Sequence, residues 1–352
     1  MSGNQSDGPG VVGDPGDSAP TWRRQLAGAI RDPGELVRLL GLPEDLLPGA
    51  RAAAKLFPLL VPRGFAALMR RGDPGDPLLR QVLPLDREAD EPPGYIADPL
   101  RESSCSPVPG LLRKYAGRAL LVVTGACAIH CRYCFRRHFP YGDIPGGRSR
   151  WEAALAHVAA DPSINELILS GGDPLTLPDG QLAELAEAFA AIPHLRRLRI
   201  HSRLPVVLPA RVDDALISWF ARGRLAPVLV IHANHANELG DEAAAACARL
   251  RSAGVTLLNQ SVLLAGVNDD AEVLAQLSER LFALGVLPYY LHALDRVRGA
   301  AHFAVADARA LAIAGALAQH LPGYLVPRLV REEPGATGKT PLGWMPSVAE
   351  SA

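Results

Sequence analysis

Three cysteines within eight residues form the densest group of soft metal ligands in the sequence. Cys127, Cys131 and Cys134 are three of the five cysteines of the chain. They follow an apolar stretch at 119–124 that predicts a buried strand, so they fall on the loop after it. A structural zinc site usually has four closing ligands, whereas three thiolates can hold three corners of an iron–sulfur cube. The spacing favours a [4Fe–4S] cluster whose fourth iron is open to a small molecule, with a zinc or redox-thiol site as the alternative.

A lysine near the end of the chain is a second candidate for chemistry. Lys339 lies between Pro334 and Pro341, with glycines at positions 335 and 338. A lysine amine can form a Schiff base with pyridoxal 5′-phosphate (PLP), and small neighbours leave room for a ligand. The two glycines are at the wrong interval for a nucleotide-binding P-loop. From the residues alone, an exposed loop lysine is the simpler interpretation.

A repeating βα pattern must position these residues. Strands are expected near residues 119–124, 165–170, 195–201, 228–232, 254–261 and 286–291, and helices near 151–160, 180–191, 212–222, 241–253, 270–284 and 305–319. This alternation predicts an α/β fold, a partial (β/α)6 TIM-like barrel with a parallel sheet. In such folds the residues just after each strand meet on one face, where the chemistry occurs.

The organisation along the chain follows from composition and pattern. We expect a disordered tail at 1–20, a helical region and linker at 21–110, the barrel at 111–331, and a C-terminal segment at 332–352 that carries the candidate lysine. Within the second of these regions, short helices are expected near residues 22–31, 35–40, 52–58 and 64–69.

Composition excludes several classes of protein. Hydrophobic residues make up 48% and charged residues 21%, which is typical of a globular chain. The net charge of −1 offers no electrostatic case for nucleic-acid binding. No signal peptide is recognisable and no apolar run approaches the ~20 residues that span a bilayer, so we expect no membrane association and a cytoplasmic protein. Cys105 and Cys247 stand alone and are expected to be structural.

The cysteine motif and a second turn resemble a known superfamily. The three cysteines, an aromatic residue after the last of them, and the sequence Gly171-Gly172-Asp173 after the second expected strand resemble the radical S-adenosylmethionine (SAM) superfamily. The resemblance implies that SAM binds the open iron through its amino and carboxylate groups. It also implies that the Gly-Gly-Asp turn meets the amino end of SAM.

Longer stretches narrow the resemblance to the lysine 2,3-aminomutase family. They lie at residues 114–118, 127–141, 202–209, 232–238 and 259–268, and the similarity runs from about residue 95 to 341. Within the family, the amino-acid sequence at 136–141 and the compact length of the chain are most similar to those of the enzymes that supply β-lysine for modification of elongation factor P. The resemblance implies isomerisation of (S)-α-lysine to (R)-β-lysine, with a 5′-deoxyadenosyl radical from SAM removing hydrogen from the β-carbon and PLP carrying the migrating nitrogen.

The resemblance also implies site residues. Lys339 becomes the PLP lysine, in place of the simpler interpretation. The other cofactor contacts that it implies are Lys114, Tyr115, Arg118 and Gln260 for PLP, and Gly171, Gly172, Asp173, Ser202, Arg203 and His232 on the SAM side. The implied substrate contacts are Arg136 for the carboxylate of lysine, and Asp295 and Glu332 for its ε-ammonium.

Two positions depart from the family pattern. Lys114 stands where the family usually has arginine, and a lysine cannot make a bidentate phosphate contact. Glu332 stands where the family has aspartate, and its side chain reaches one methylene farther.

The resemblance implies three partners: the substrate lysine, a reductant such as flavodoxin or ferredoxin, and an elongation factor P lysyl-ligase that receives the product. Two alternatives remain open. One is a free-standing lysine 2,3-aminomutase of lysine catabolism or β-lysine metabolism, whose longer members carry further C-terminal cysteines that are lacking after Cys247. The other, more distant, is a zinc-binding interaction protein without catalysis.

Overall fold

A single sheet runs through the part of the chain that the structure describes. The computed structural model describes residues 20–143 and 149–343, so the tail predicted at 1–20 lies outside the described residues except for Pro20. Within these ranges nine strands follow one another in the sheet in the order of the chain. Their bounds are β1 Leu111–Leu112, β2 Arg118–Thr124, β3 Glu166–Gly171, β4 Arg197–Ser202, β5 Ala226–Ile231, β6 Thr256–Val262, β7 Leu287–His292, β8 Arg328–Arg331 and β9 Thr340–Pro341.

The strands β2 to β8 form the parallel part of the sheet. Each pairs in parallel with the next, whereas β1 pairs antiparallel with β2, and β9 antiparallel with β8. This confirms the α/β class and the partial barrel, including all six expected strands. The seventh parallel strand, β8, was not predicted, because its four residues include two arginines and carry no β-rich pattern.

Side-chain alternation separates the two faces of the sheet. In β2, Ala119, Leu121 and Val123 are buried in the main hydrophobic core. The residues between them point to the opposite face, because successive strand side chains alternate. That opposite face is the barrel interior, where polar side chains from the strands can reach a ligand.

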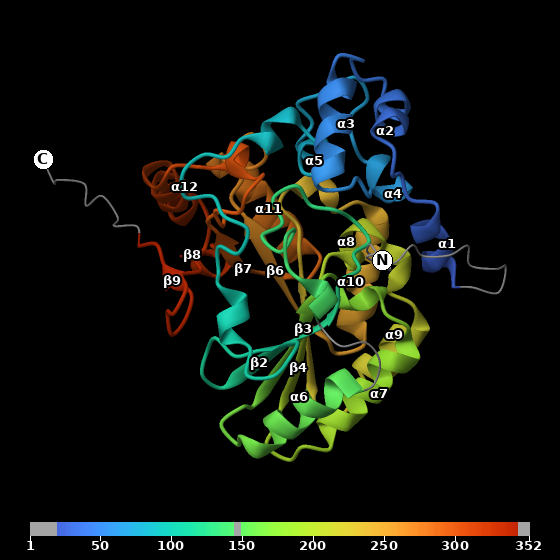
Figure 1. The fold of residues 1–352 in the computed structure, drawn as a ribbon, viewed down its shortest axis with the longest axis vertical. Helices are drawn as coiled ribbons and strands as arrows, with labels where there is room; N and C mark the ends of the chain where they lie inside the picture. Colours follow the sequence, from blue (N-terminus) through green and yellow to red (C-terminus); the bar gives the residue numbers. More distant parts are fainter. Residues whose placement is uncertain (1–19, 144–148, 344–352) are drawn as a thin grey trace, which may run out of the picture.

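The helices form two groups. The N-terminal group contains α1 Thr21–Ala27, α2 Pro33–Leu40, α3 Leu46–Leu56, α4 Arg63–Ala66 and α5 Pro77–Arg80. The helices that follow the cysteine loop are α6 Ser149–Ala160, α7 Asp179–Ala190, α8 Leu204–Val207, α9 Asp214–Phe220, α10 Asp241–Ser252, α11 Ala271–Ala283 and α12 Asp307–His320. In Figure 1 the blue helices α2 to α5 gather at one end of the molecule, above the sheet. None of the described helices is long and apolar enough to cross a membrane.

The N-terminal helical region holds the cysteine loop in place. Arg132, between two of the cysteines, is fully buried, and its guanidinium pairs with both carboxylate oxygens of Glu88. The backbone N–H of Arg132 donates to the carbonyl oxygen of Gln81 at 2.9 Å, and that of His130 donates to Leu60 at 3.0 Å. A buried bidentate pair of this kind fixes a loop firmly, because separating it would leave buried charges without partners.

Candidate functional site

The three clustered cysteines lie on the loop that follows β2. None of them is in a disulfide, and the N–H of Cys134 donates to the carbonyl of Cys131 at 3.0 Å, which closes a turn. Burial, together with the nearby thiols, raises the pKa of Cys127 well above its usual value and that of Cys134 to about 11. The loop therefore presents three neighbouring sulfur donors toward the end of the sheet.

The donor set suits an iron–sulfur cluster. Within residues 20–143 and 149–343, no three His, Cys, Asp or Glu side chains surround a position for one metal ion. In a cluster each thiolate binds its own iron, so its cysteines need not converge on a single point. Three free thiols on one loop fit such a cluster at three corners.

Two glycines let the end of β3 approach the cysteine loop closely. A Cβ atom on Gly172 would lie 2.3 Å from the carbonyl oxygen of Ala126. Gly171 has φ of +119°, and a Cβ there would lie 2.6 Å from the carbonyl oxygen of Thr124. The N–H groups of Gly172 and Asp173 donate to Thr124 and Ala126, both at 2.7 Å. Any larger residue would push the loop away from the sheet.

Asp173 ties the ends of two strands together. Its carboxylate accepts from the hydroxyl of Ser202 and from the N–H of Arg203, both at 2.7 Å. It also accepts from the N–H of Leu175 and caps a short 3-10 helix, η4 Pro174–Thr176. Burial raises the pKa of Asp173 to about 6, although these hydrogen bonds act in the opposite direction.

The guanidinium of Arg203 lies against the cysteine loop. It donates to the sulfur of Cys131 at 2.7 Å and to carboxylate and amide oxygens of Glu238 and Gln81 at 2.8 and 2.6 Å. Glu238 and Gln81 are fully buried, and neither was among the expected site residues. Glu238 lies within a stretch that carried the family resemblance, which was the one signal that could have found it.

Histidines line the barrel interior beside this network. His232 follows β5, and its Nε2 lies 2.9 Å from the amide nitrogen of Gln260 in β6. Burial, with the positive charge of Arg203 nearby, lowers the pKa of His232 to about 3, and burial lowers that of His292 to about 3. The Nε2 atoms of His201 and His292 are buried and have no hydrogen-bond partner within the described residues. Neutral imidazoles with free nitrogens suit a polar ligand in the interior.

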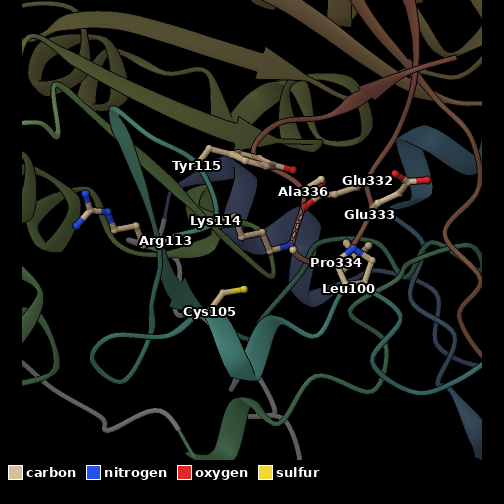
Figure 2. Close-up of a pocket in the computed structure, with 10 residues that line it drawn as sticks. Leu100, Cys105, Arg113, Lys114, Tyr115, Glu332, Glu333, Pro334 and Ala336 are labelled. Carbon is tan, nitrogen blue, oxygen red and sulfur yellow. Dashed lines mark hydrogen bonds and ion pairs between the residues drawn. The ribbon is translucent and has the colours of Figure 1, made fainter. Parts of the chain in front are cut away.

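Glu332 joins the two lysines of the barrel. It follows β8, and its carboxylate oxygens lie 2.7 Å from Nζ of Lys114 and 2.9 Å from Nζ of Lys339. Figure 2 shows Lys114 and Glu332 directed toward one another, with Tyr115 beside them. Burial alone would raise the pKa of Glu332, but the ammonium groups of Lys339 and Lys114 outweigh it and hold the pKa well below its usual value.

The ion pairs continue to the cysteine side through Glu102. This carboxylate lies 2.9 Å from Nζ of Lys114 and accepts from Nε and Nη2 of Arg136 at 2.7 and 2.8 Å. Arg136, Glu102, Lys114, Glu332 and Lys339 thus form one continuous series, called here the ion-pair chain. It brings four of the expected site residues together through Glu102, which was not among them because nothing in its local sequence pattern marks it.

Asp295 and Tyr115 lie close to the ion-pair chain. Burial, together with the negative charge of Glu332, raises the pKa of Asp295 to about 7, although Lys339 and Lys114 lower it. The guanidinium carbon of Arg118 lies 4.6 Å from the centre of the Tyr115 ring. A cavity of about 80 Å³ opens here, lined among others by Lys114, Tyr115 and Glu332 (Figure 2). A phenol with the cations Lys114 and Arg118 near it suits a phosphorylated aromatic ligand.

Apart from His232 and Gln260, which contact each other, the expected site residues fall into two neighbouring groups. One contains the cysteines, Gly171, Gly172, Asp173, Ser202 and Arg203 at the ends of β2, β3 and β4. The other is the ion-pair chain with Tyr115, Arg118 and Asp295. Arg136 bridges them, because its Nη1 donates to the hydroxyl of Ser170 in β3 at 3.0 Å while its other edge binds Glu102. The site suits two different ligands side by side.

Comparisons with known proteins agree with this geometry. Residues 121–277 match the model of the Radical SAM superfamily. The chain is 54% identical to the L-lysine 2,3-aminomutase of Escherichia coli (strain K12), over 92% of this chain and 95% of the relative. It is 49% identical to the protein of that name from Haemophilus influenzae, over 91% and 94%. It is 36% identical to that from Clostridium subterminale, over 91% of this chain and 77% of the relative.

These similarities cover nearly the whole chain at identities well above chance. They identify an enzyme of the isomerase class. The alternative of a zinc-binding interaction protein without catalysis was therefore wrong. Membership of the superfamily implies a [4Fe–4S] cluster and SAM. The chain belongs to the lysine 2,3-aminomutase family of the radical SAM superfamily.

Proposed function

We propose that this enzyme converts (S)-α-lysine to (R)-β-lysine in a radical 2,3-amino shift that requires SAM and PLP. The observation that carries the proposal is the ion-pair chain, which sets a guanidinium, two ammonium groups and two carboxylates along one wall of the barrel. Lysine has a carboxylate at one end and an ammonium at the other, so it needs a cation and an anion a side chain's length apart.

Each cofactor has a set of residues that would hold it. Cys127, Cys131 and Cys134 would hold the cluster, and the turn at Gly171 to Asp173 with Ser202 and His232 would face SAM. Lys339 would hold PLP covalently through its ε-amine, with Lys114, Tyr115, Arg118 and Gln260 around the cofactor. When bound, these groups supply the radical and the electron sink that the amino shift needs.

Substrate orientation follows from the charged residues. Arg136 would bind the carboxylate of lysine, because a guanidinium matches a carboxylate in two hydrogen bonds. Glu332 and Asp295 would bind the ε-ammonium. Glu332 already pairs with two ammonium groups in this structure, and Asp295 lies within the same electrostatic environment. Holding both ends of the substrate keeps its β-carbon at a fixed place, which is how an enzyme gains from proximity.

We further propose that the product serves the modification of elongation factor P. The chain is 54% identical to the Escherichia coli relative and 36% identical to the clostridial one. The higher identity to the first supports this proposal over a free-standing aminomutase of lysine catabolism or β-lysine metabolism. The proposal includes a flavodoxin or ferredoxin as reductant, a lysyl-ligase as recipient of β-lysine, and a cytoplasmic location.

One assay tests the reaction. The protein is reconstituted anaerobically with iron and sulfide, reduced, and incubated with SAM, PLP and isotopically labelled L-lysine. We expect labelled β-lysine, with SAM not consumed in proportion to product. Turnover of another amino acid in preference to lysine would overturn the substrate assignment.

A second assay tests the role of Lys339. After borohydride reduction and denaturation, the wild type should retain bound PLP absorbance, and Lys339→Ala should lose it. Lys55→Ala is the matched control, because Lys55 is exposed on α3, away from the barrel interior, and should retain the absorbance. Retention of the absorbance by Lys339→Ala would refute the assignment.

A further inference from the structure

We propose that Glu102 is a positioning residue that orients Arg136 toward the carboxylate of the substrate and Lys114 toward PLP. The inference rests on the proposed function. It concerns a residue that lies between the two cations and that would touch neither the substrate nor the reacting atoms.

Glu102 is built into the wall of the site. It begins a short 3-10 helix, η2 Glu102–Cys105, and only 2% of its surface is exposed. Its N–H donates to the carboxylate of Asp98 at 3.1 Å, which anchors the start of η2. A carboxylate buried to this degree requires charged partners, because desolvation of an unpaired charge is strongly unfavourable.

The hydrogen bonds of Arg136 determine which edge of its guanidinium a ligand could approach. Nε and Nη2 donate to the two oxygens of Glu102, so this edge is occupied. Nη1 donates to the hydroxyl of Ser170 at 3.0 Å and, at the longer distance of 3.5 Å, to the carbonyl oxygen of Gly171. A guanidinium has five N–H donors, and the edge between Nη1 and Nη2 is the other one that can bind a carboxylate with two parallel hydrogen bonds. The hydrogen bonds to Glu102 therefore fix the orientation of the Nη1–Nη2 edge of Arg136.

The same carboxylate also fixes Lys114. Its Oε1 accepts from Nη2 of Arg136 at 2.8 Å and lies 2.9 Å from Nζ of Lys114. One oxygen atom therefore sets the separation between the cation proposed for the substrate carboxylate and a cation proposed for PLP. Without the charge of Glu102, three cations of the ion-pair chain would share one carboxylate, that of Glu332, and would repel one another.

The experiment compares two ligands in two proteins. PLP-loaded wild type and Glu102→Gln are titrated with L-lysine and with L-lysinamide, which has no carboxylate, and the affinities are measured by calorimetry. Loss of a buried charged partner weakens a bound ion pair by roughly ten-fold or more. We expect Glu102→Gln to lower the preference for lysine over lysinamide by about this factor and to weaken the binding of PLP itself.

A purely structural role predicts a different result. If Glu102 only braces the fold, both ligands should lose affinity equally in Glu102→Gln, and their ratio should not change; that outcome overturns the inference. Glu88→Gln is the matched control. Glu88 also forms a bidentate ion pair with a buried arginine, Arg132, but this pair lies outside the ion-pair chain. The control should leave the ratio unchanged.

Two further outcomes are decisive. If Glu102→Gln fails to fold, Glu102→Asp replaces it, because aspartate keeps the charge on a side chain that is one methylene shorter. This variant should lower the ratio of lysine affinity to lysinamide affinity, while its melting temperature stays close to that of the wild type. A wild type that binds and turns over no lysine would refute the proposed function, and the role of Glu102 with it. Normal turnover by the wild type with an unchanged ratio in both variants would refute the role of Glu102 alone.

Discussion

Nζ of Lys114 lies 2.7 Å from a carboxylate oxygen of Glu332, so the two positions at which the sequence departs from the aminomutase pattern contact each other. A lysine is more compact at its charged end than an arginine, and a glutamate reaches farther than an aspartate. We therefore expect the two departures to compensate for one another.

This contact predicts a coupled pair of substitutions. Lys114→Arg and Glu332→Asp should each weaken PLP binding by about ten-fold, because each changes the length of one side chain in the Lys114–Glu332 ion pair and leaves the other unchanged. The double variant should recover most of the loss. PLP dissociation constants from absorbance titrations would measure the coupling, and losses that simply add in the double variant would contradict it.

Asp295 predicts a dependence of substrate binding on pH. Burial beside Glu332 raises the pKa of Asp295 to about 7, and only the ionised carboxylate attracts an ammonium group. The KM for lysine should therefore fall as the pH rises through about 7, while Asp295→Asn should have a KM roughly ten-fold higher at pH 8 and lose this dependence. Steady-state kinetics between pH 6 and pH 8 would measure both.

Asp307 provides the control for this experiment. It pairs with Arg331 near the protein surface, and that guanidinium lowers its pKa. Asp307→Asn should keep the wild-type profile of KM against pH. A profile that persists in Asp295→Asn would assign the pH dependence to another group.

The cysteine loop predicts which thiols hold iron. After anaerobic reconstitution, the wild type should contain about four irons per chain and absorb in the visible range, and Cys131→Ala should lose most of both. Cys247 is fully buried in the main hydrophobic core, and Cys247→Ala should keep the iron content. Equal iron in the two variants would show that the cluster lies elsewhere.

The close approach of β3 to the loop predicts a steric effect. Gly172→Ala should lower the free energy of unfolding by about 1–3 kcal/mol and reduce the iron content, because its Cβ would meet the carbonyl oxygen of Ala126 at 2.3 Å. A Cβ at Gly180, on α7, would meet nothing within 4 Å. Gly180→Ala should be neutral or stabilise by up to about 1 kcal/mol. Denaturant unfolding compares the two, and a neutral Gly172→Ala would contradict the packing argument.

The sequence predicted the elements better than the contacts. Alternating β-rich and helical stretches are local properties, and they predicted six parallel strands and the helices between them. The short strand β8 lacked such a pattern. Glu102 could not have been found in this way, because its importance comes from Arg136, 34 residues away along the chain, and from Lys114. Contacts between distant segments exist once the sheet has formed, and no spacing in the sequence encodes them.

The buried polar residues near the cysteines illustrate the same limit. Gln81 lies 122 residues before Arg203 in the sequence, yet its amide oxygen accepts a hydrogen bond from the guanidinium of Arg203 in the folded protein. In the sequence it is one glutamine between Arg80 and Val82, in no recognisable motif. The family resemblance could suggest Lys339 and Arg203, but Gln81 lies outside every stretch that carried the resemblance.

The two antiparallel strands at the borders of the sheet have a consequence for the behaviour of the molecule in solution. An open parallel sheet would normally leave two rows of unpaired backbone groups, which can recruit strands from other copies and start aggregation. Here β1 and β9 have only two residues each, so each border offers too few free N–H and C=O groups to extend. The segment that delivers Lys339 to the barrel thus also protects the open sheet against edge-to-edge association.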